Sequence, residues 1–430
     1  MKVKALLAFA TVASLGLTAC GSGGSDKPTG DEDVSGQTIT VSLAEGTYTN
    51  ELKSRIPDFE KETGVKVDLN ILGLDQLSNQ YQVKLNAKSA DLDVMLFRPQ
   101  QEVRLFNDNG WLMDLSELVK QDAEWKWDDF SESSRASVTV DDGLFGIPTM
   151  TEREILFYNK KMFEEANVEV PSTMEELRSA AEALHKPEKN QFGIVMRGNL
   201  SAAVTTFSGF LYSYGGEWVD DQGMASINTP EAIEAYQYYG GLLKDFGPRG
   251  ADSVDSNQAR AIFQNGQAAM YIDPDSGAGL LEDEAESQVA GNVGYAPFPT
   301  GPKGMHPYDV TSWAAGISEF SENKEASWQF LKWATSADLL AGAMKNHQCP
   351  SPRKSSWDDP EVAEGFSQEL VGIFNAYQGT AVGHDRPIVI EVSKVRDIVG
   401  KPIVAAINGQ EVEAAAEAAN KEFQSYLESE

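Results

Sequence analysis

The sequence predicts an α/β fold, because segments with strand and helix character alternate in two separate zones of the chain. In the first zone, residues 38–44 (TITVSLA) form an apolar run of the kind found in buried strands. The helix expected after it carries Leu52, Ile56 and Phe59 on one face and stops at Gly64. The elements predicted for this zone are strand 38–44, helix 50–64, strand 65–72, helix 81–89 and strand 92–97, the order of a doubly wound layer.

The second zone begins near residue 150 and repeats the alternation. Ser172 and Glu175 have the spacing of a capping box and follow Pro171, so they predict the start of a helix. Thr229 followed by Pro230 predicts another helix start. The elements predicted here are strand 155–159, helix 174–184, strand 192–196, a helix from 230, strand 268–272, and helices 325–334 and 412–427. About 395 residues follow residue 36, enough for two or three domains with their own cores.

The first 36 residues have the composition of an export signal and a tether. Two lysines precede a 15-residue apolar run, 5–19, which is shorter than the roughly 20 residues of a membrane-spanning helix. The run ends in "LTAC", which resembles the lipobox of bacterial lipoproteins and implies cleavage before Cys20 and lipidation of its sulfur. The sequence thus predicts a signal peptide at 1–19 and a lipidated, flexible tether at 20–36. The alternative is a plain signal peptide with an incidental cysteine.

Composition narrows the classes of partner and chemistry. The chain has 35 basic and 66 acidic side chains, and its net charge of −31 disfavours binding to nucleic acid or to anionic lipid. If Cys20 is acylated, Cys349 has no partner for an intramolecular disulfide and is expected to be a small buried residue. The four histidines are scattered, and no cysteine and histidine spacing of a zinc site occurs. We therefore expect neither a metal nor a cofactor.

Two acidic patterns have features of enzyme or metal motifs. Asp273, Asp275 and Glu284 stand at positions 1, 3 and 12 of a calcium loop, but Ala278 replaces the glycine that its turn needs. A polar turn after a strand is the favoured interpretation. Carboxylate pairs at 152/154 and 273/275 leave glycoside hydrolysis open, because sequence does not give the separation of side chains across a cleft.

Several segments resemble family 1 of the extracellular solute-binding proteins, the carbohydrate receptors of ABC importers. The most specific is "GIP" at 146–148, followed by "YNKKMF" at 158–163 and "PSTMEEL" at 171–177. "FEKETGVKV", "FQNGQAAMYI" and "VGYAPFPTGPKG" continue the likeness in order, and "CPSPRKS" is similar to polyol-binding members. The resemblance implies two α/β lobes joined by three chain crossings, a periplasmic-binding-protein-like fold that closes like a hinge. The lobes are expected at 37–150 plus 274–334 and at 151–273 plus 335–430.

The resemblance also implies a set of ligand contacts in the interlobe cleft. The residues at matching positions are Glu45, Thr47, Tyr48, Phe97, Arg98, Gln100, Glu152, Trp218, Asp273, Ser276, Trp313 and Arg353. Aromatic faces and planar polar groups of this kind suit a neutral polyol or saccharide, while the arginines leave room for an acidic sugar. For Trp218 a core position stays open, and for Arg98 and Arg353 a structural ion pair stays open.

The resulting expectation is a non-enzymatic receptor that captures a sugar, oligosaccharide or polyol and delivers it to an ABC transporter permease. It is expected to be a monomer outside the cytoplasm, held at the cell membrane only through its lipid anchor. Two alternatives remain at this stage. The chain could be a surface glycan-degrading enzyme, or a lipoprotein that docks polysaccharide without transport.

Overall fold

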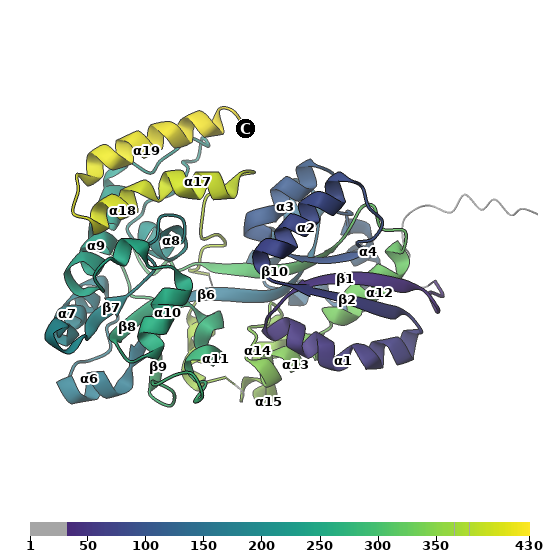
Figure 1. Ribbon diagram of the computed structural model, residues 1–430, viewed down its shortest axis with the longest axis horizontal. Helices are drawn as coiled ribbons and strands as arrows, with labels where there is room; N and C mark the ends of the chain where they lie inside the picture. The colour runs from purple at the N-terminus through teal and green to yellow at the C-terminus, as the bar shows by residue number, and fades with distance from the viewer. Residues whose placement is uncertain (1–31, 365, 378) are drawn as a thin grey trace, which may run out of the picture.

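The computed structural model describes residues 32–364, 366–377 and 379–430, which fold into two α/β lobes side by side (Figure 1). The predicted signal peptide, Cys20 and most of the predicted tether lie outside the described residues. The described chain begins on the first lobe, where the backbone carbonyl of Glu32 accepts a hydrogen bond from Gln329 Nε2 at 2.9 Å.

The first lobe contains a sheet with the strand order β2-β1-β3-β10-β6. Its first three strands are parallel, and β10 runs antiparallel to both β3 and β6. The strands are β1 (Thr38–Ala44), β2 (Lys66–Leu72), β3 (Val94–Phe97), β6 (Ile147–Asn159) and β10 (Asp309–Ile317), with a small pair β4 (Thr139–Val140) and β5 (Gly143–Leu144). The helices are α1 (Thr47–Thr63), α2 (Leu74–Asn86), α3 (Pro99–Asp108), α4 (Ser116–Gln121), α5 (Glu132–Ser137), α12 (Lys324–Ala334) and α13 (Ala337–His347).

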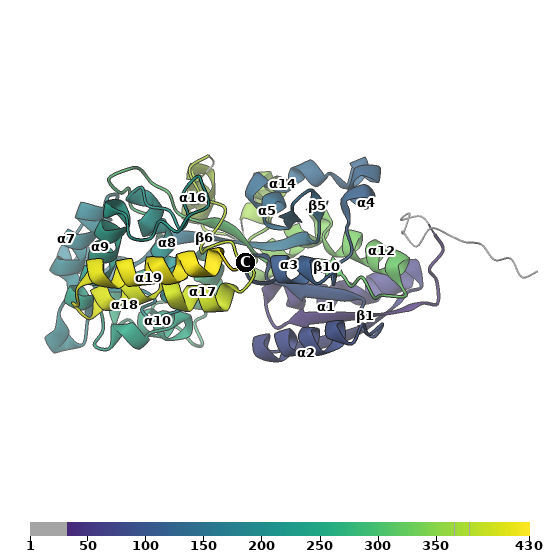
Figure 2. The same cartoon turned by 90° about the horizontal axis from the view of Figure 1, so that it is seen from above.

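The second lobe is built on the other half of β6. There β6 pairs with β8 (Ala268–Pro274) and β9 (Val293–Pro297), and β7 (Phe192–Val195) runs parallel to β8. The helices are α6 (Lys160–Ala166), α7 (Met174–Leu184), α8 (Ala203–Ser213), α9 (Pro230–Phe246), α10 (Ser256–Gln264), α11 (Ala278–Leu281), α16 (Gln368–Ala376), α17 (Val392–Val399), α18 (Lys401–Ile407) and α19 (Val412–Leu427). Helices α14 (Lys354–Asp358) and α15 (Pro360–Ala363) pack beside α13 at the junction of the lobes, while Trp357 of α14 belongs to the second core. Figure 2 shows α17, α18 and α19 together over the second lobe.

Three chain crossings join the lobes. The first is β6 itself, which pairs with β10 through residues 147–153 and with β8 and β9 through residues 154–159. The second lies between β9 and β10, and the third between α13 and α14. This confirms the predicted fold class, an α/β protein of two lobes with a hinge of three crossings. A hinge in which few segments cross lets the lobes move as bodies around a small number of backbone torsions.

The buried cores correct the predicted lobe boundaries at two places. One core holds apolar side chains from 34–147 and 314–349, and the other holds those from 155–298 and from 344–426. The predicted boundaries place 274–308 in the first lobe, but β9 pairs with the second half of β6 and buries Tyr295 in the second core. They place 335–349 in the second lobe, but Leu339 and Leu340 of α13 pack into the first core. Both placements are therefore wrong.

Local sequence signals account for the ends of several helices. The capping box before α7 is one residue later than predicted. Its N-cap is Thr173, whose hydroxyl accepts from Glu176 N at 3.2 Å, while the Glu176 carboxylate accepts from Thr173 N. Helix α1 ends at Gly64, whose φ of 74° lies in the left-handed region that favours glycine. In the described part of the chain, no helix combines the length and apolar character that a bilayer crossing requires.

Candidate binding site

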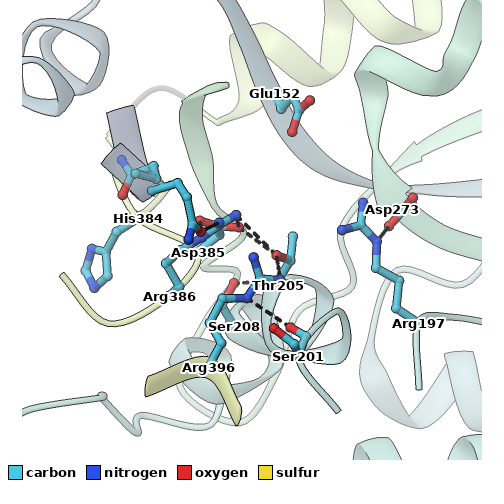
Figure 3. Close-up of polar contacts among 12 residues, drawn as sticks. Glu152, Arg197, Ser201, Thr205, Ser208, Asp273, His384, Asp385, Arg386 and Arg396 are labelled. Carbon is cyan, nitrogen blue, oxygen red and sulfur yellow. Dashed lines mark hydrogen bonds and ion pairs between the residues drawn. The ribbon is translucent and has the colours of Figure 1, made fainter. Parts of the chain in front are cut away.

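Charged and hydroxyl side chains from several elements of the second lobe meet near the point where β6 passes between the lobes (Figure 3). We call this group the arginine–carboxylate cluster, and its members are Arg197, Thr205, Asp273, Asp385, Arg386 and Arg396. Arg197 follows β7, Thr205 is on α8, Asp273 is on β8, Asp385 and Arg386 are in the loop before α17, and Arg396 is on α17. Glu152, on β6, faces the cluster from the crossing strand.

The first ion pair of the cluster follows from the pairing of β7 with β8. Val195 is opposite Tyr271, so the parallel strands carry Arg197 and Asp273 out of the sheet side by side. Arg197 Nε donates to Asp273 Oδ1 at 2.6 Å. Burial opposes the charge on Arg197, but the Asp273 carboxylate outweighs it and raises the pKa of the guanidinium. Within the described chain, neither Nη atom of Arg197 has a hydrogen-bond partner, so both can donate to a ligand.

The second ion pair connects the loop before α17 to α8. Arg386 clamps Asp385 with two nitrogens, and its Nε donates to Asp385 Oδ1 at 2.7 Å. Thr205 Oγ1 donates to the other Asp385 oxygen at 2.8 Å. Burial alone would raise the pKa of Asp385, but the Arg386 charge lowers it to about 2. This carboxylate is therefore ionised and held rigidly at any physiological pH.

Arg396 is the arginine of the cluster that forms no ion pair with a described carboxylate. Its Nε donates to the carbonyl of Ser201 at 2.9 Å and its Nη2 to Thr205 Oγ1 at 3.1 Å. No carboxylate lies within ion-pair distance of it among the residues that the structure covers. Burial and the neighbouring Arg386 lower the pKa of Arg396 well below its usual value. Arg396 thus fastens α17 to α8 and to the segment just before it.

Glu152 differs from the other carboxylates of the site because none of the described arginines forms an ion pair with it. Ser276 Oγ donates to its Oε1 at 3.1 Å. Burial raises the pKa of Glu152 to about 7, against the opposing attraction of Arg197. Near neutral pH the carboxyl can thus accept a hydrogen bond as an anion or donate one as an acid. Two residues further on, Glu154 has no exposed surface and burial raises its pKa strongly, so it is a neutral core residue.

The structure brings together some of the predicted contacts. Glu152, Asp273 and Ser276 lie in or beside the cluster. On the first lobe, Trp313 of β10 is paired with Met150 of β6, two residues before Glu152, and keeps part of its surface exposed. Thr47, also partly exposed, has its hydroxyl 3.8 Å from the Met150 sulfur. Trp313 and Thr47 thus lie next to Met150, two residues before Glu152 on the same strand.

Three predicted aromatic contacts are wrong, because the rings are enclosed in the cores. The Tyr48 hydroxyl donates to the carbonyl of Ala334 at 2.9 Å inside the first lobe. Phe97 has no exposed surface and belongs to the same core. Trp218 is 1% exposed in the second core, and its Nε1 donates to the Tyr212 hydroxyl at 2.7 Å. None of these rings offers a face to a ligand.

Arg353 is also a structural residue and not a ligand contact. Its guanidinium lies 4.2 Å from the ring centre of Phe130 and 5.1 Å from that of Trp125. Its Nη1 lies 3.2 Å from Asp129 Oδ2, and its Nε donates to the carbonyl of Thr335. The side chain is only 1% exposed. It therefore fastens the third crossing to the first lobe.

The remaining predicted residues lie at the edge of the first lobe. Glu45 is exposed directly after β1. Arg98 forms an ion pair with Glu102 at 3.2 Å, the structural pairing that the sequence left open. Gln100 donates from Nε2 to the carbonyl of Gly383 at 3.1 Å, which is a contact with the second lobe.

The motifs weighed as metal or catalytic sites do not have the required geometry. Asp273 is paired with Arg197, and Asp275 with Arg153, whose Nη2 lies 2.7 Å away. These carboxylates are thus bound to cations of the protein and do not form a calcium loop. Glu154 is enclosed, so it cannot flank a glycosidic bond together with Glu152. In the described segments, no group of three or more acidic, cysteine or histidine side chains could hold a metal.

Sequence reasoning missed most of the cluster. Arg197 directly follows a predicted strand, and the ends of parallel strands are where α/β folds place ligands, so this rule could have identified it. Asp385 and Arg386 are in an irregular loop, and no periodicity or motif marks them. Thr205 is on a helix that the sequence did not predict.

The fold and the position of the site define a two-lobed binding protein with polar groups gathered beside its hinge. The family model for bacterial extracellular solute-binding proteins matches residues 42–339, and the chain belongs to this family. This establishes the family that the sequence resembled.

Among its relatives, the mannitol-binding protein of Pseudomonas aeruginosa is 30% identical over 55% of this chain and 54% of its own length. The match thus spans about half of that relative. The erythritol/L-threitol-binding protein of Mycolicibacterium smegmatis is 25% identical, over 79% of this chain and 77% of its own. A solute-binding protein of Agrobacterium radiobacter, solved with ribitol, is 26% identical with a TM-score of 0.80, covering 92% of this chain and all of the solved one.

Proposed function

We propose that this protein is an extracytoplasmic receptor that captures a small, neutral polyol between its lobes for an ABC importer. The observation that carries the proposal is the arginine–carboxylate cluster facing Glu152 at the first crossing. A polyol offers many hydroxyl groups, each of which both donates and accepts hydrogen bonds. Fixed guanidinium donors alternating with fixed carboxylate acceptors suit such a ligand. The mannitol-, erythritol- and ribitol-binding relatives support this class of ligand.

The scarcity of open aromatic faces favours a short polyol over a long saccharide. Pyranose rings are bound largely by stacking on flat aromatic side chains. Of the predicted aromatic contacts, Tyr48, Phe97 and Trp218 are enclosed in cores, and Trp313 alone keeps exposed surface near Glu152. An open-chain polyol needs one apolar wall and many polar partners, which is the combination present here.

The balance of charge favours a neutral ligand over an acidic sugar. Arg197 and Arg386 each have an aspartate partner, and Glu152 adds a further acidic group beside them. A carboxylate on the ligand would have to displace one of these partners or approach Glu152. Arg396 is the exception, but its guanidinium already donates to Ser201 and Thr205.

The location and partners extend the proposal beyond the described residues. The lipobox-like "LTAC" supports lipidation at Cys20, and the residues between Cys20 and Val34, which is buried in the first core, would then tether the receptor to the cell membrane. The hydrogen bond from Gln329 to the carbonyl of Glu32 supports this arrangement, because it places the chain that would follow the tether on the first lobe. Closure of the lobes around the polyol would present the receptor, as a monomer without catalytic activity, to permease subunits.

A thermal-shift panel tests the ligand class. The purified chain is heated with mannitol, ribitol, erythritol, maltose, maltotriose or glucuronate, each at several concentrations. A ligand at 100 times its Kd stabilises the folded state by about 2.7 kcal/mol, so binding at Kd values far below the added concentration gives a clear rise in Tm. We expect the rise with at least one alditol. A rise with maltotriose or glucuronate alone, or cleavage of an oligosaccharide by the chain, would overturn the proposal.

Arg197→Met provides the matched variant for this panel. It keeps much of the length of the side chain but removes the two free Nη donors. The shift caused by the alditol should shrink strongly in this variant. Arg178→Met on the exposed face of α7, where Arg178 pairs with Asp245 at 2.6 Å, is the control and should respond as the parent does.

A further inference from the structure

A second contact between the lobes lies away from β6, where α3 of the first lobe meets the loop and helix at 383–393 of the second. The start of helix α17 meets α3 there (Figures 1 and 2). Gln101 uses both ends of its amide across this junction. Its Oε1 accepts from Arg386 Nη1 at 3.2 Å, and its Nε2 donates to Ser393 Oγ at 2.9 Å.

Cavities on both sides of Gln101 show that the contact is narrow. One of about 260 Å³ is lined by Gln100, Gln101, Gly383 and His384, among others, and one of about 290 Å³ by Gln101, Glu102 and Ser393, among others. The lobes therefore do not form a continuous apolar interface at this place. A junction of a few polar contacts between hollows can open without exposing a large apolar surface to water.

Arg386 connects this junction to the binding cluster. The same guanidinium clamps Asp385 and is attracted by Glu152, while its Nη1 reaches Gln101. A planar guanidinium has five N–H donors in a fixed fork, so its orientation toward one partner determines its orientation toward the others. A ligand that touches Arg386 would thus influence whether Gln101 can reach it.

We propose that Gln101 is a positioning residue that clasps the two lobes through Arg386 and Ser393 and so sets the fraction of the receptor that is closed. The inference rests on the proposed function of the site, and it adds the coupling between site and closure. Because coupling is reciprocal, a ligand that orders Arg386 favours the clasp, and the clasp slows the release of that ligand. The apparent Kd equals the intrinsic Kd divided by the fraction of competent closed states.

The variant that tests the clasp is Gln101→Leu, which keeps the size of the side chain and removes both hydrogen-bonding ends. Ser393→Ala removes one of the two bonds. Gln82→Leu is the matched control, since Gln82 is exposed and borders one of the two cavities, and no hydrogen bond joins its side chain to the second lobe among the residues described. None of these positions belongs to the cluster.

The readout is the distance between the lobes in the ligand-free chain, measured by pulsed electron paramagnetic resonance. Spin labels on Val83→Cys and Lys421→Cys, both at exposed positions, report α2 against α19 in a Cys20→Ser background. The parent and Gln82→Leu should show a population at the short distance. In Gln101→Leu, the ratio of short to long distance should fall about tenfold, as expected for the loss of about 1.4 kcal/mol. Ser393→Ala should lie between.

The same distribution in Gln101→Leu as in the parent would overturn the clasp, whatever ligand the receptor binds. A shift in Gln101→Leu together with no binding of any alditol would leave the clasp in place and overturn the proposed function instead. Stopped-flow binding of the alditol selected by the panel gives a second readout. Gln101→Leu should raise the dissociation rate constant several-fold and leave the Tm of the ligand-free chain unchanged, whereas a residue that only supports folding would lower that Tm.

Discussion

Replacing Glu152 by glutamine should make the folded protein more stable at alkaline pH, relative to the parent, and not at acidic pH. The carboxyl has a pKa of about 7 in the folded chain, because burial outweighs the attraction of Arg197, and the ordinary value is 4.5. Between these values the folded state binds more protons than the unfolded state. The free energy of unfolding therefore falls as the pH rises through this window.

The size of the effect follows from the same shift. Each pKa unit corresponds to about 1.36 kcal/mol, and the carboxyl of the unfolded chain is already largely ionised at pH 5. The part of the shift that lies between roughly pH 5 and pH 9 should therefore lower the free energy of unfolding by about 2.5 kcal/mol. The assay is urea unfolding of parent and Glu152→Gln at both pH values. Taking the difference between the two proteins cancels the contributions of other titrating groups. One of these is Asp309, because burial raises its pKa to about 6. Equal pH dependence in both proteins would refute the assignment of a partly buried, largely unpaired carboxyl at residue 152.

Four further variants each test a single side chain. Trp313→Ala should weaken alditol binding at least tenfold, about 1.4 kcal/mol by calorimetry, with little loss of Tm. Trp328→Ala should show the reverse, because the ring is 1% exposed in the first core and its removal costs about 3–5 kcal/mol of folding free energy. Arg353→Met should lower the free energy of unfolding by about 3 kcal/mol, because Asp129 loses its arginine partner, and should leave the Kd of the alditol unchanged. Weaker alditol binding at unaltered stability would instead place Arg353 in the site. Cys20→Ser should move the protein from the membrane fraction to the soluble fraction, and retention on membranes in detergent-free buffer would contradict lipidation.

Most strands and the amphipathic helices could be predicted because the apolar positions in their sequences are the positions that the fold buries. Strand 38–44 has the predicted bounds because its apolar run is mostly buried, and helices 174–184 and 412–427 have theirs because one face of each is buried and the other is exposed. Helix α8 could not be predicted in this way, because it has no exposed polar face. Every residue of Ala203–Ser213 is buried, so the segment is apolar or small all round and shows no helical period. Helix α2 begins seven residues before the predicted 81, in a polar stretch after Gly73.

The site was less predictable than the fold, because residue type does not tell which way a side chain points. Phe97 and Trp218 have the right chemistry for a sugar contact, yet each fills a core. The predicted lobe boundaries were wrong for a related reason. Strand pairing decides where a segment packs, and β9 pairs with β6 across a long stretch of sequence. Asp385 and Arg386 reach the cluster from a loop whose position depends on the whole second lobe.

A crystal structure of the receptor with the alditol that gives the largest thermal shift is the most direct test of the central claim. We expect one polyol between the lobes, with hydroxyl groups within hydrogen-bond distance of an Nη atom of Arg197 and of the Glu152 carboxyl. Trp313 should cover one side of its carbon chain. A polyol bound elsewhere on the chain, or one held in the cleft without contact to Arg197 or Glu152, would contradict the proposed site.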